Sequence, residues 1–302
     1  MRGIVKRKNK KPESFGSKAF SAVNGLILII LAAICLLPVV NVLMISLSSN
    51  DAVRAGRVSF WPVEFTLSSY EYVAHRAAFW KSMGVSLLRC VLGVSINVLM
   101  CILTAYPLSK PSSRFKGRTA YTWFFFLTML INGGLIPAFM TVKSLHLLGT
   151  IWALVLPGAV PVFNVVLMIN FFRTVPTELE EAAIMDGAGQ WQIMVKIFVP
   201  ICRPSVATIM MFSLVSHWNA WFDGIIYMNK PDQYPLQSYL NTIIIDAANL
   251  TAGSFDYQLM NLISDRTVKC AQIFVSMVPM LLIYPFLQRY FVKGMVMGSV
   301  KG

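Results

Sequence analysis

Four of the chain's 13 acidic residues lie within one short stretch, residues 177–200, which reads TELEEAAIMDGAGQWQIMVKIFVP. Clustered carboxylates can act as general acids and bases or hold a metal ion, but such sites also need a convergent nucleophile, His or Cys. This stretch contains neither His nor Cys, and the chain's 3 His and 5 Cys residues show no metal-ligand spacing. We therefore expect no catalytic residue and no metal site, and we interpret the acids as helix-terminal and docking groups.

The order of residues in this stretch predicts two short helices. Thr177 and Glu180 have the spacing of a capping box, which satisfies two backbone N–H groups at a helix start. Gly187 suits the left-handed conformation that ends a helix, and we expect Pro200 to end the second helix. Apolar residues at i, i+3, i+4 and i+7 predict one buried face on that helix: Trp191, Met194, Val195 and Phe198. This periodicity fits equally well a hairpin that links two membrane spans and a knob that enters a cleft on another protein.

The composition places this helical pair in a membrane protein. Of 302 residues, 56% are hydrophobic and 13% are charged, and the mean hydropathy is +0.64, which is too apolar for a water-soluble domain. The net charge of +13 does not indicate nucleic-acid binding, because the basic residues lie between long apolar runs. A helix needs about 20 residues to cross a bilayer. Six segments qualify: 20–47, 81–108, 119–140, 150–172, 205–226 and 268–291. We expect an all-α membrane protein with a basic cytoplasmic arm, 1–19, and a domain of six transmembrane helices, 20–302.

The positions of Lys and Arg predict which loops face the cytoplasm, because these residues resist transfer across the membrane. If the N-terminus is inside, 17 of the 26 Lys and Arg residues fall in inner segments and 8 fall in outer ones. We therefore expect both termini in the cytoplasm. The acidic stretch then belongs to a cytoplasmic two-helix loop, residues 173–204, between the fourth and fifth spans.

The same loop carries a sequence motif. Its fixed positions are Glu181-Ala182-Ala183, then Asp186-Gly187-Ala188, then Ile197, Pro200 and Pro204. This pattern resembles the EAA loop of the membrane subunits of bacterial ABC importers, in which E-A-A-x-x-D-G-A precedes a Phe and then I-x-L-P-x-x-x-P. The chain departs from the pattern with Met194 at the Phe position and Val199 at the Leu position. Both changes keep an apolar side chain of similar bulk.

From about Val85 onward the chain is similar to the carbohydrate-uptake permeases, the group that contains the maltose importer, and especially to its branch for polysaccharides and complex oligosaccharides. The resemblance implies a permease subunit in the bacterial cytoplasmic membrane that moves an oligosaccharide or polysaccharide by alternating access. In that family the EAA loop inserts into a cleft of a separate ATPase. The residues that would couple transport to ATP hydrolysis are Glu181, Ala182, Ala183, Asp186 and Gly187.

The resemblance also implies several partners. These are a second homologous permease subunit, two copies of an ABC ATPase that bind ATP and Mg, an extracytoplasmic solute-binding protein, the sugar and membrane lipid. The chain has no G-x-x-x-x-G-K-[ST] phosphate loop, which ATP-hydrolysing subunits of this kind require. We therefore expect this chain to be no enzyme and to hold no cofactor of its own.

The fifth span contains residues suited to sugar contacts. Polar side chains within a membrane usually face the bundle interior, and a sugar needs hydrogen-bond partners and aromatic faces. We therefore expect a substrate path that includes Ser216, Trp218, Asn219 and Trp221. The alternative is an aromatic belt at the membrane interface, with Asn219 hydrogen-bonded to a neighbouring helix.

The outer segment 227–267 is too long for a simple connection, which favours a function of its own. By resemblance to the corresponding maltose-importer subunit, the middle of this segment would reach the solute-binding protein. The residues concerned are Asn249, Leu250, Thr251 and Gly253.

Two other classes of protein compete with this interpretation. A secondary transporter driven by an ion gradient normally has buried ionisable residues in its spans, and only Arg89 and His217 are candidates here. A membrane enzyme would need a cluster of acid, base and nucleophile near one face. Autonomous transport in liposomes would support the first, whereas a copurifying ATPase would support the ABC importer.

Overall fold

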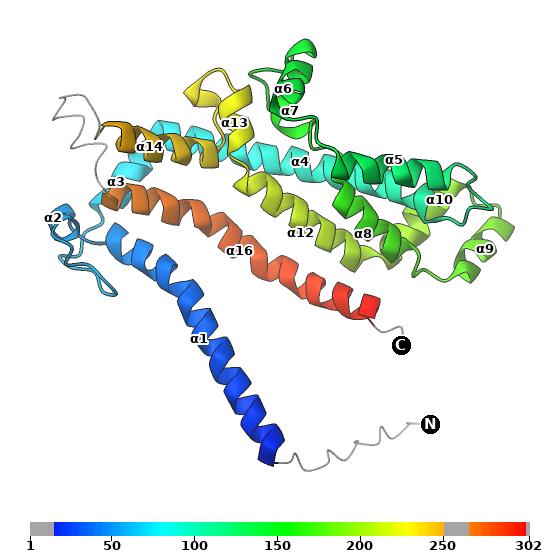
Figure 1. Ribbon diagram of the computed structural model, residues 1–302, viewed down its shortest axis with the longest axis horizontal. Helices are drawn as coiled ribbons and strands as arrows, with labels where there is room; N and C mark the ends of the chain where they lie inside the picture. Colours follow the sequence, from blue (N-terminus) through cyan, green and yellow to red (C-terminus); the bar gives the residue numbers. More distant parts are fainter. Residues whose placement is uncertain (1–14, 251–265, 300–302) are drawn as a thin grey trace. The chain divides into compact units, whose positions relative to one another are not determined.

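The computed structural model describes residues 15–250 and 266–299, and these residues form helices joined by loops (Figure 1). The chain divides into two compact units. One comprises Met1–Glu71 with Asp265–Phe274, and the other comprises Tyr72–Ser264 with Val275–Gly302. The basic arm expected at 1–19 lies largely outside the described residues.

The first unit is built on α1 (Phe15–Ser46), whose large apolar side chains between Phe20 and Leu37 are exposed. Such a surface suits a helix that faces lipid or another subunit. Towards its end, Ile45 packs with Val53 of α2 (Asn50–Arg54) and with Cys270 of α16 (Arg266–Ser299). The Thr267 hydroxyl of α16 also donates a hydrogen bond to the side chain of Asn50.

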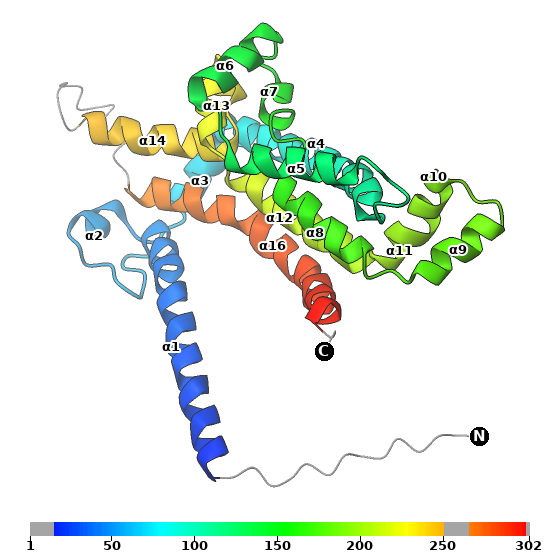
Figure 2. The ribbon, with the colours of Figure 1, turned by 45° about the vertical axis from the view of Figure 1, so that its right-hand side comes forward.

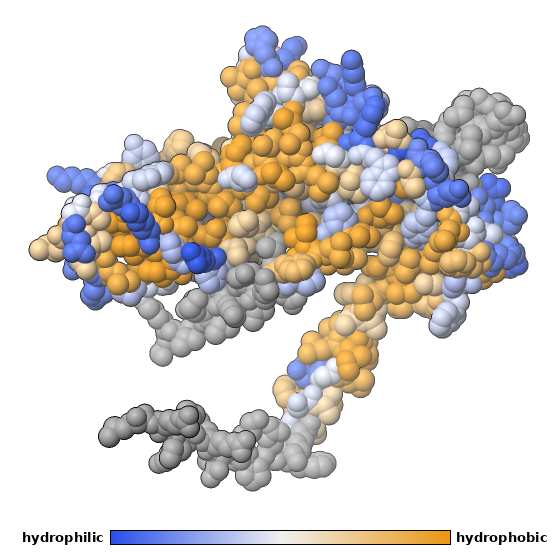
Figure 3. Space-filling model, turned by 180° about the vertical axis from the view of Figure 1, so that it is seen from behind, coloured by the Kyte–Doolittle hydropathy of each residue, from blue (hydrophilic) through white to orange (hydrophobic). Residues whose placement is uncertain are grey.

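The second unit is organised around one long helix, α4 (Ala77–Ser109). α5 (Arg118–Leu130), α8 (Val162–Phe172) and α12 (Arg203–Asn219) pack along it, as both ribbon views show (Figures 1 and 2). Apolar side chains cover much of the outer surface of the helices, and hydrophilic ones gather towards their ends (Figure 3). This distribution is the one expected of helices that cross hydrocarbon.

Shorter elements lie at the two ends of α4. Near its start are α3 (Ser68–His75), η2 (Pro231–Gln233) and α14 (Leu236–Leu250), while α6 (Leu135–Ser144) and α7 (Ile151–Val155) pack with α13 (Phe222–Tyr227). Near its end lie α9 (Thr177–Met185), α10 (Gln190–Ile193), a π-helical turn over Met194–Phe198 and α11 (Val199–Ile201). The segment 227–267, expected to be a loop, thus contains the helix α14.

Three helices among the described residues are long and apolar enough to cross a membrane: Ala19–Ser46, Ala77–Ser109 and Arg266–Phe286. They match the first, second and sixth expected spans. Two further candidates are bent helix pairs, Arg118–Leu130 with Leu135–Ser144, and Gln190–Ile201 with Arg203–Asn219. The described residues therefore contain three to five candidate spans by length and composition.

The expectation of a continuous third span over 119–140 is wrong. α5 and α6 meet at an angle of 114°. The Asn132 side chain accepts a hydrogen bond of 2.9 Å from the Gly134 N–H, and Gly134 has a φ of +87°. This short Asn-Gly-Gly sequence forms a turn, because glycine adopts positive φ without strain and the Asn side chain replaces a helical hydrogen bond.

The fourth and fifth expected spans are also interrupted. Residues 156–161 separate α7 from α8 and include Pro157, Gly158 and Pro161, which break helical hydrogen bonding. α8 alone has 11 residues, or about 16 Å at 1.5 Å per residue, which is too short for the hydrocarbon core. α12 ends at Asn219, and the chain turns before it enters α13, so a single helix over 205–226 is wrong as well.

Candidate functional site

The second helix of the 173–204 loop is anchored in the core of the bundle. Ile193, Met194 and Phe198 are buried there. The Phe198 ring lies nearly perpendicular to the rings of Tyr106 from α4 and Phe172 from α8, with centroids 5.1 Å and 5.6 Å away. Three interlocked rings from three elements therefore join this loop to two helices of the bundle.

The predicted apolar stripe is only half right. Met194 and Phe198 are buried, but Trp191 and Val195 are exposed. The helix makes a π turn over Met194–Phe198, and the extra residue in that turn shifts the buried face. Nor does the helix end at Pro200, since it continues to Ile201. The missing N–H of Pro200 falls beside the π turn, where the regular hydrogen-bond pattern is already interrupted.

The first helix of the loop, α9, is held by a buried carboxylate. Glu180 is 4% exposed, and its Oε1 lies 2.8 Å from Lys110 Nζ and 2.9 Å from Arg114 Nη1. The Lys110 ammonium also lies 4.1 Å from the ring centroid of Tyr106 and 4.0 Å from that of Phe198. Both cations come from the chain that follows α4, so Glu180 fastens α9 to the end of the central helix. Burial lowers the pKa of Lys110, and the Glu180 carboxylate opposes this shift.

The expected capping box is wrong. α9 begins at Thr177 with Pro176 at the N-cap, and no side chain caps it. The Glu180 carboxylate pairs with Lys110 and Arg114 and is therefore not directed back to the helix start. The sequence spacing fitted a local motif, but two cations that are distant in sequence attract this carboxylate more strongly than a neutral backbone N–H.

Four of the five expected coupling residues lie on the exposed side of this anchored pair, and Ala182 and Asp186 are two of them. The fifth, Ala183, is partly buried against the core. The Glu181 side chain is 62% exposed, with one oxygen 3.3 Å from Arg114 Nη2. Gly187 has a φ of +80°, which confirms the left-handed helix end. The loop thus presents a small, partly acidic surface on a base that is packed into the bundle core.

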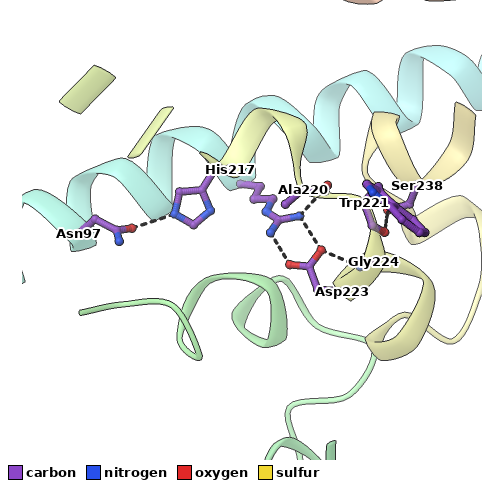
Figure 4. Close-up of polar contacts among 8 residues, drawn as sticks. Asn97, His217, Ala220, Trp221, Asp223, Gly224 and Ser238 are labelled. Atoms are coloured by element: carbon purple, nitrogen blue, oxygen red, sulfur yellow. Dashed lines mark hydrogen bonds and ion pairs between the residues drawn. The ribbon is translucent and has the colours of Figure 1, made fainter. Parts of the chain in front are cut away.

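A cavity of about 560 Å³ lies within the second unit, between α4, α7, α8, α12 and α13. It is named the polar cavity here for its Asn, Ser and His side chains and its ion pair, although apolar side chains such as Leu154 and Val160 also line it. Asn97 of α4 donates a hydrogen bond of 2.9 Å to the Gly158 carbonyl. It also accepts one of 2.8 Å from His217 Nε2 (Figure 4). Asn164 of α8 donates to the Ser213 hydroxyl at 3.3 Å. Asn97 and Asn164 therefore link the helices through the cavity wall.

An ion pair closes one side of this cavity. Arg89 of α4 is 3% exposed, and its two terminal nitrogens bind the two carboxylate oxygens of Asp223 (Figure 4). Its Nη1 also donates to the Ala220 carbonyl at 3.3 Å. Arg89 is recognisable in the sequence as an ionisable residue within a span. No spacing connects it with its partner Asp223, which lies in α13 beyond the interruption at Ala220.

The structure separates the four residues expected on a substrate path. Ser216 lines the cavity, whereas the other three are not among its lining residues. Trp218 is buried in the bundle, and Asn219 and Trp221 are exposed. The Trp221 carbonyl accepts a hydrogen bond of 2.6 Å from Ser238 (Figure 4).

The residues expected to meet a binding protein cannot be placed in this site. Asn249 and Leu250 belong to the last turn of α14, with side chains outside the described part of the chain. Thr251 and Gly253 lie outside the described residues altogether.

Comparison with known proteins gives a consistent result. Residues 98–297 match the family model described as "Binding-protein-dependent transport system inner membrane component". The polygalacturonan/rhamnogalacturonan transport system permease protein YtcP of Bacillus subtilis is 36% identical over 91% of this chain and 96% of its own length. Protein LplC of the same organism is 36% identical over 94% of this chain and 96% of its own.

A solved structure is similar as well. It is the crystal structure of a bacterial ABC transporter involved in the import of the acidic polysaccharide alginate. It aligns with a TM-score of 0.84 and 33% sequence identity over 93% of this chain and 100% of that chain. With the family model matching about two thirds of its length, the chain belongs to the family of binding-protein-dependent ABC transporter permeases, multi-pass proteins of the inner membrane.

Proposed function

We propose that the chain is one of two permease subunits in a bacterial importer that takes an oligosaccharide or polysaccharide from a solute-binding protein. The observation that carries this proposal is the 173–204 loop, which presents the EAA residues on a base fixed into the bundle core. Similarity to permeases and a transporter named for polygalacturonan, rhamnogalacturonan and alginate supports a carbohydrate substrate. ATP and Mg are then bound by two separate ATPase subunits, and this chain hydrolyses nothing.

The proposal includes six membrane crossings, with both termini in the cytoplasm. α1, α4 and α16 are the unbroken spans and α5 with α6 is an interrupted one. For the remaining two crossings the proposal pairs α7 with α8 across the break at 156–161, and α12 with α13 across the break at Ala220. Two sets of contacts support this arrangement. The pairs of Glu180 and Glu181 with Lys110 and Arg114 join two loops expected inside, and the pair of Lys81 with Asp232 joins two segments expected outside.

In this proposal, the coupling loop transmits the movement of the ATPases to the helix bundle. Closure of the ATPases displaces α9, α10 and the turn between them, whose exposed surface includes Glu181, Ala182, Asp186 and Gly187. The displacement passes to α4 and α8 through the ring cluster and the Glu180 ion pairs, because close-packed side chains transmit strain. Alternating access follows if the helices that line the cavity move with α4.

Affinity purification of the chain from its native membrane tests the proposal. We expect an ATP-hydrolysing subunit and a second permease to copurify, and the solute-binding protein with sugar to stimulate ATPase activity. Replacement of both Glu181 and Gly187 should release the ATPase. A chain that stays alone and still moves solute in liposomes would mean that transport does not depend on ATP.

A further inference from the structure

The wall of the polar cavity contains a buried guanidinium, that of Arg89. The packing of membrane helices alone does not require a positive charge at this position. Arg89 is 3% exposed on a helix with an apolar surface. Ionisable residues in such positions are costly, and they usually mark a path for substrate or ions. The planar guanidinium of Arg is matched to two kinds of oxyanion, carboxylates and phosphates, which it binds through two parallel hydrogen bonds. The partner that Arg89 holds in this structure is a carboxylate.

Asp223 is the carboxylate that binds the Arg89 guanidinium, and it is more exposed to solvent than Arg89. Its side chain is 27% exposed, against 3% for that of Arg89. Asp223 belongs to α13, a helix of six residues that follows the interruption after Asn219. The buried Nε of Arg89 meanwhile finds no hydrogen-bond partner among the described residues. Asp223 is thus the more accessible member of the pair. It leaves the Arg89 Nε–H without a hydrogen-bond acceptor among the described residues.

Apart from the ion pair and His217, the polar side chains that line the cavity are amides and hydroxyls, beside apolar side chains such as Leu154 and Val160. Asn97, Asn164, Ser213 and Ser216 are among them, and their amides and hydroxyls can exchange hydrogen bonds with a ligand rich in hydroxyl groups. The volume of about 560 Å³ lies within the range of about 300–1,000 Å³ typical of small-molecule sites. A sugar unit that carries one carboxylate, a uronic acid, matches both the neutral polar wall and the single guanidinium.

We infer that this cavity binds a uronic-acid unit during transport, with Arg89 holding its carboxylate and Asp223 holding Arg89 when no sugar is present. The inference rests on the proposed function. Exchange of one carboxylate for another keeps the guanidinium paired throughout, and an unpaired buried charge is strongly unfavourable. A neutral sugar would have to separate Arg89 from Asp223 without replacing the lost charge. Discrimination against neutral sugars follows from this difference.

The test compares one sugar in two forms. Purified complete transporter in proteoliposomes, with its binding protein, is given trigalacturonate or the same trimer with its carboxylates reduced to alcohols. Equilibrium binding to the detergent-solubilised transporter without binding protein is measured in parallel. We expect the double variant Arg89→Gln/Asp223→Asn, which keeps a hydrogen-bonding pair, to lower the preference for the acidic trimer at least 10-fold in both measurements. The single variant Asp223→Asn removes the internal competitor and should bind the acidic trimer several-fold more tightly.

A second ion pair offers the matched control. Lys81 and Asp232 likewise join α4 to a segment that follows α12, but both are exposed and outside the cavity. Lys81→Gln/Asp232→Asn should leave the preference unchanged. If the Arg89 and Asp223 double variant transports with the wild-type preference, the pair is only structural and the inference is overturned. If that variant fails to assemble, the Asp223→Asn affinity decides, and an unchanged value overturns the inference. A wild-type transporter that imports neither trimer with ATP would instead contradict the proposed function.

Discussion

Two adjacent glutamates of α9 have opposite surroundings, and we expect different results from their removal. Glu180→Gln leaves Lys110 buried beside two rings without its counter-charge, which typically costs about 3–5 kcal/mol. Glu181→Gln breaks a pair that is largely exposed and should cost about 0–1 kcal/mol. Thermal unfolding of the detergent-solubilised chain and proteolysis of α9 measure the difference.

A double replacement separates charge from packing at this position. In Lys110→Met/Glu180→Leu, apolar side chains of similar size take the place of the pair, and such exchanges are often neutral or stabilising. We expect the double variant to recover most of the stability lost in Glu180→Gln. Equal instability of the two variants would show that the shape of the site, and not its charge balance, holds α9.

At the scale of residues, sequence reasoning was limited by distance along the chain. The exposure of Glu181 and the positive φ of Gly187 are local properties, and local pattern was a sufficient guide to them. Glu180 meets cations 66 and 70 positions away in the numbering, and Arg89 meets Asp223 across 134. No spacing rule connects residues so far apart, so the sequence predicts a local cap for Glu180 where the structure has two ion pairs.

At the scale of elements, the contact between α4 and α12 depends on a glycine. A Cβ added at Gly93 would overlap the ring of His217, the residue that donates to Asn97. Overpacking of this kind typically costs about 1–3 kcal/mol. We therefore expect Gly93→Ala to lower the unfolding temperature of the solubilised chain and to weaken the link between the two helices.

Gly84 is the control on the same helix. A Cβ there meets nothing within 4 Å, so Gly84→Ala should be neutral or stabilise by about 0.4–1 kcal/mol through the unfolded state. If Gly93→Ala is as stable as Gly84→Ala, the His217 ring moves without cost, and the close approach of α4 and α12 is not what orders this part of the bundle.

Some of the helices can be predicted from the sequence. Hydropathy was a sufficient guide to α1, α4 and α16, because an apolar run of this length has few alternatives to a spanning helix. It failed where the helices break. Asn132-Gly133-Gly134 and Pro157-Gly158 are ordinary turn sequences, but averaging over about 20 residues conceals them. In membrane proteins such breaks are tolerated only where protein or a water-filled cavity surrounds the backbone, and Gly158 indeed borders the polar cavity.

At the scale of the whole molecule, the proposed mechanism requires that the coupling loop keep one shape while force passes through it. Gly187 tests this requirement, because its φ of +80° is strained for any other residue although a Cβ there meets nothing within 4 Å. Left-handed backbone costs a residue with a Cβ about 1–2 kcal/mol. We expect Gly187→Val to reduce uptake and sugar-stimulated ATPase activity of the assembled transporter at least several-fold, with little change in the stability of the bundle.

Gly189 shows whether conformation is the cause. It also has open space around it, but its φ is −72°, which valine adopts readily. Gly189→Val adds the same bulk to the same exposed surface without strain, so it should retain coupling. If both variants lose coupling equally, bulk at the ATPase interface is responsible. If both variants keep coupling, the loop tolerates a change of shape. Movement must then reach the bundle through other contacts, most directly through the Glu180 ion pairs that join α9 to α4.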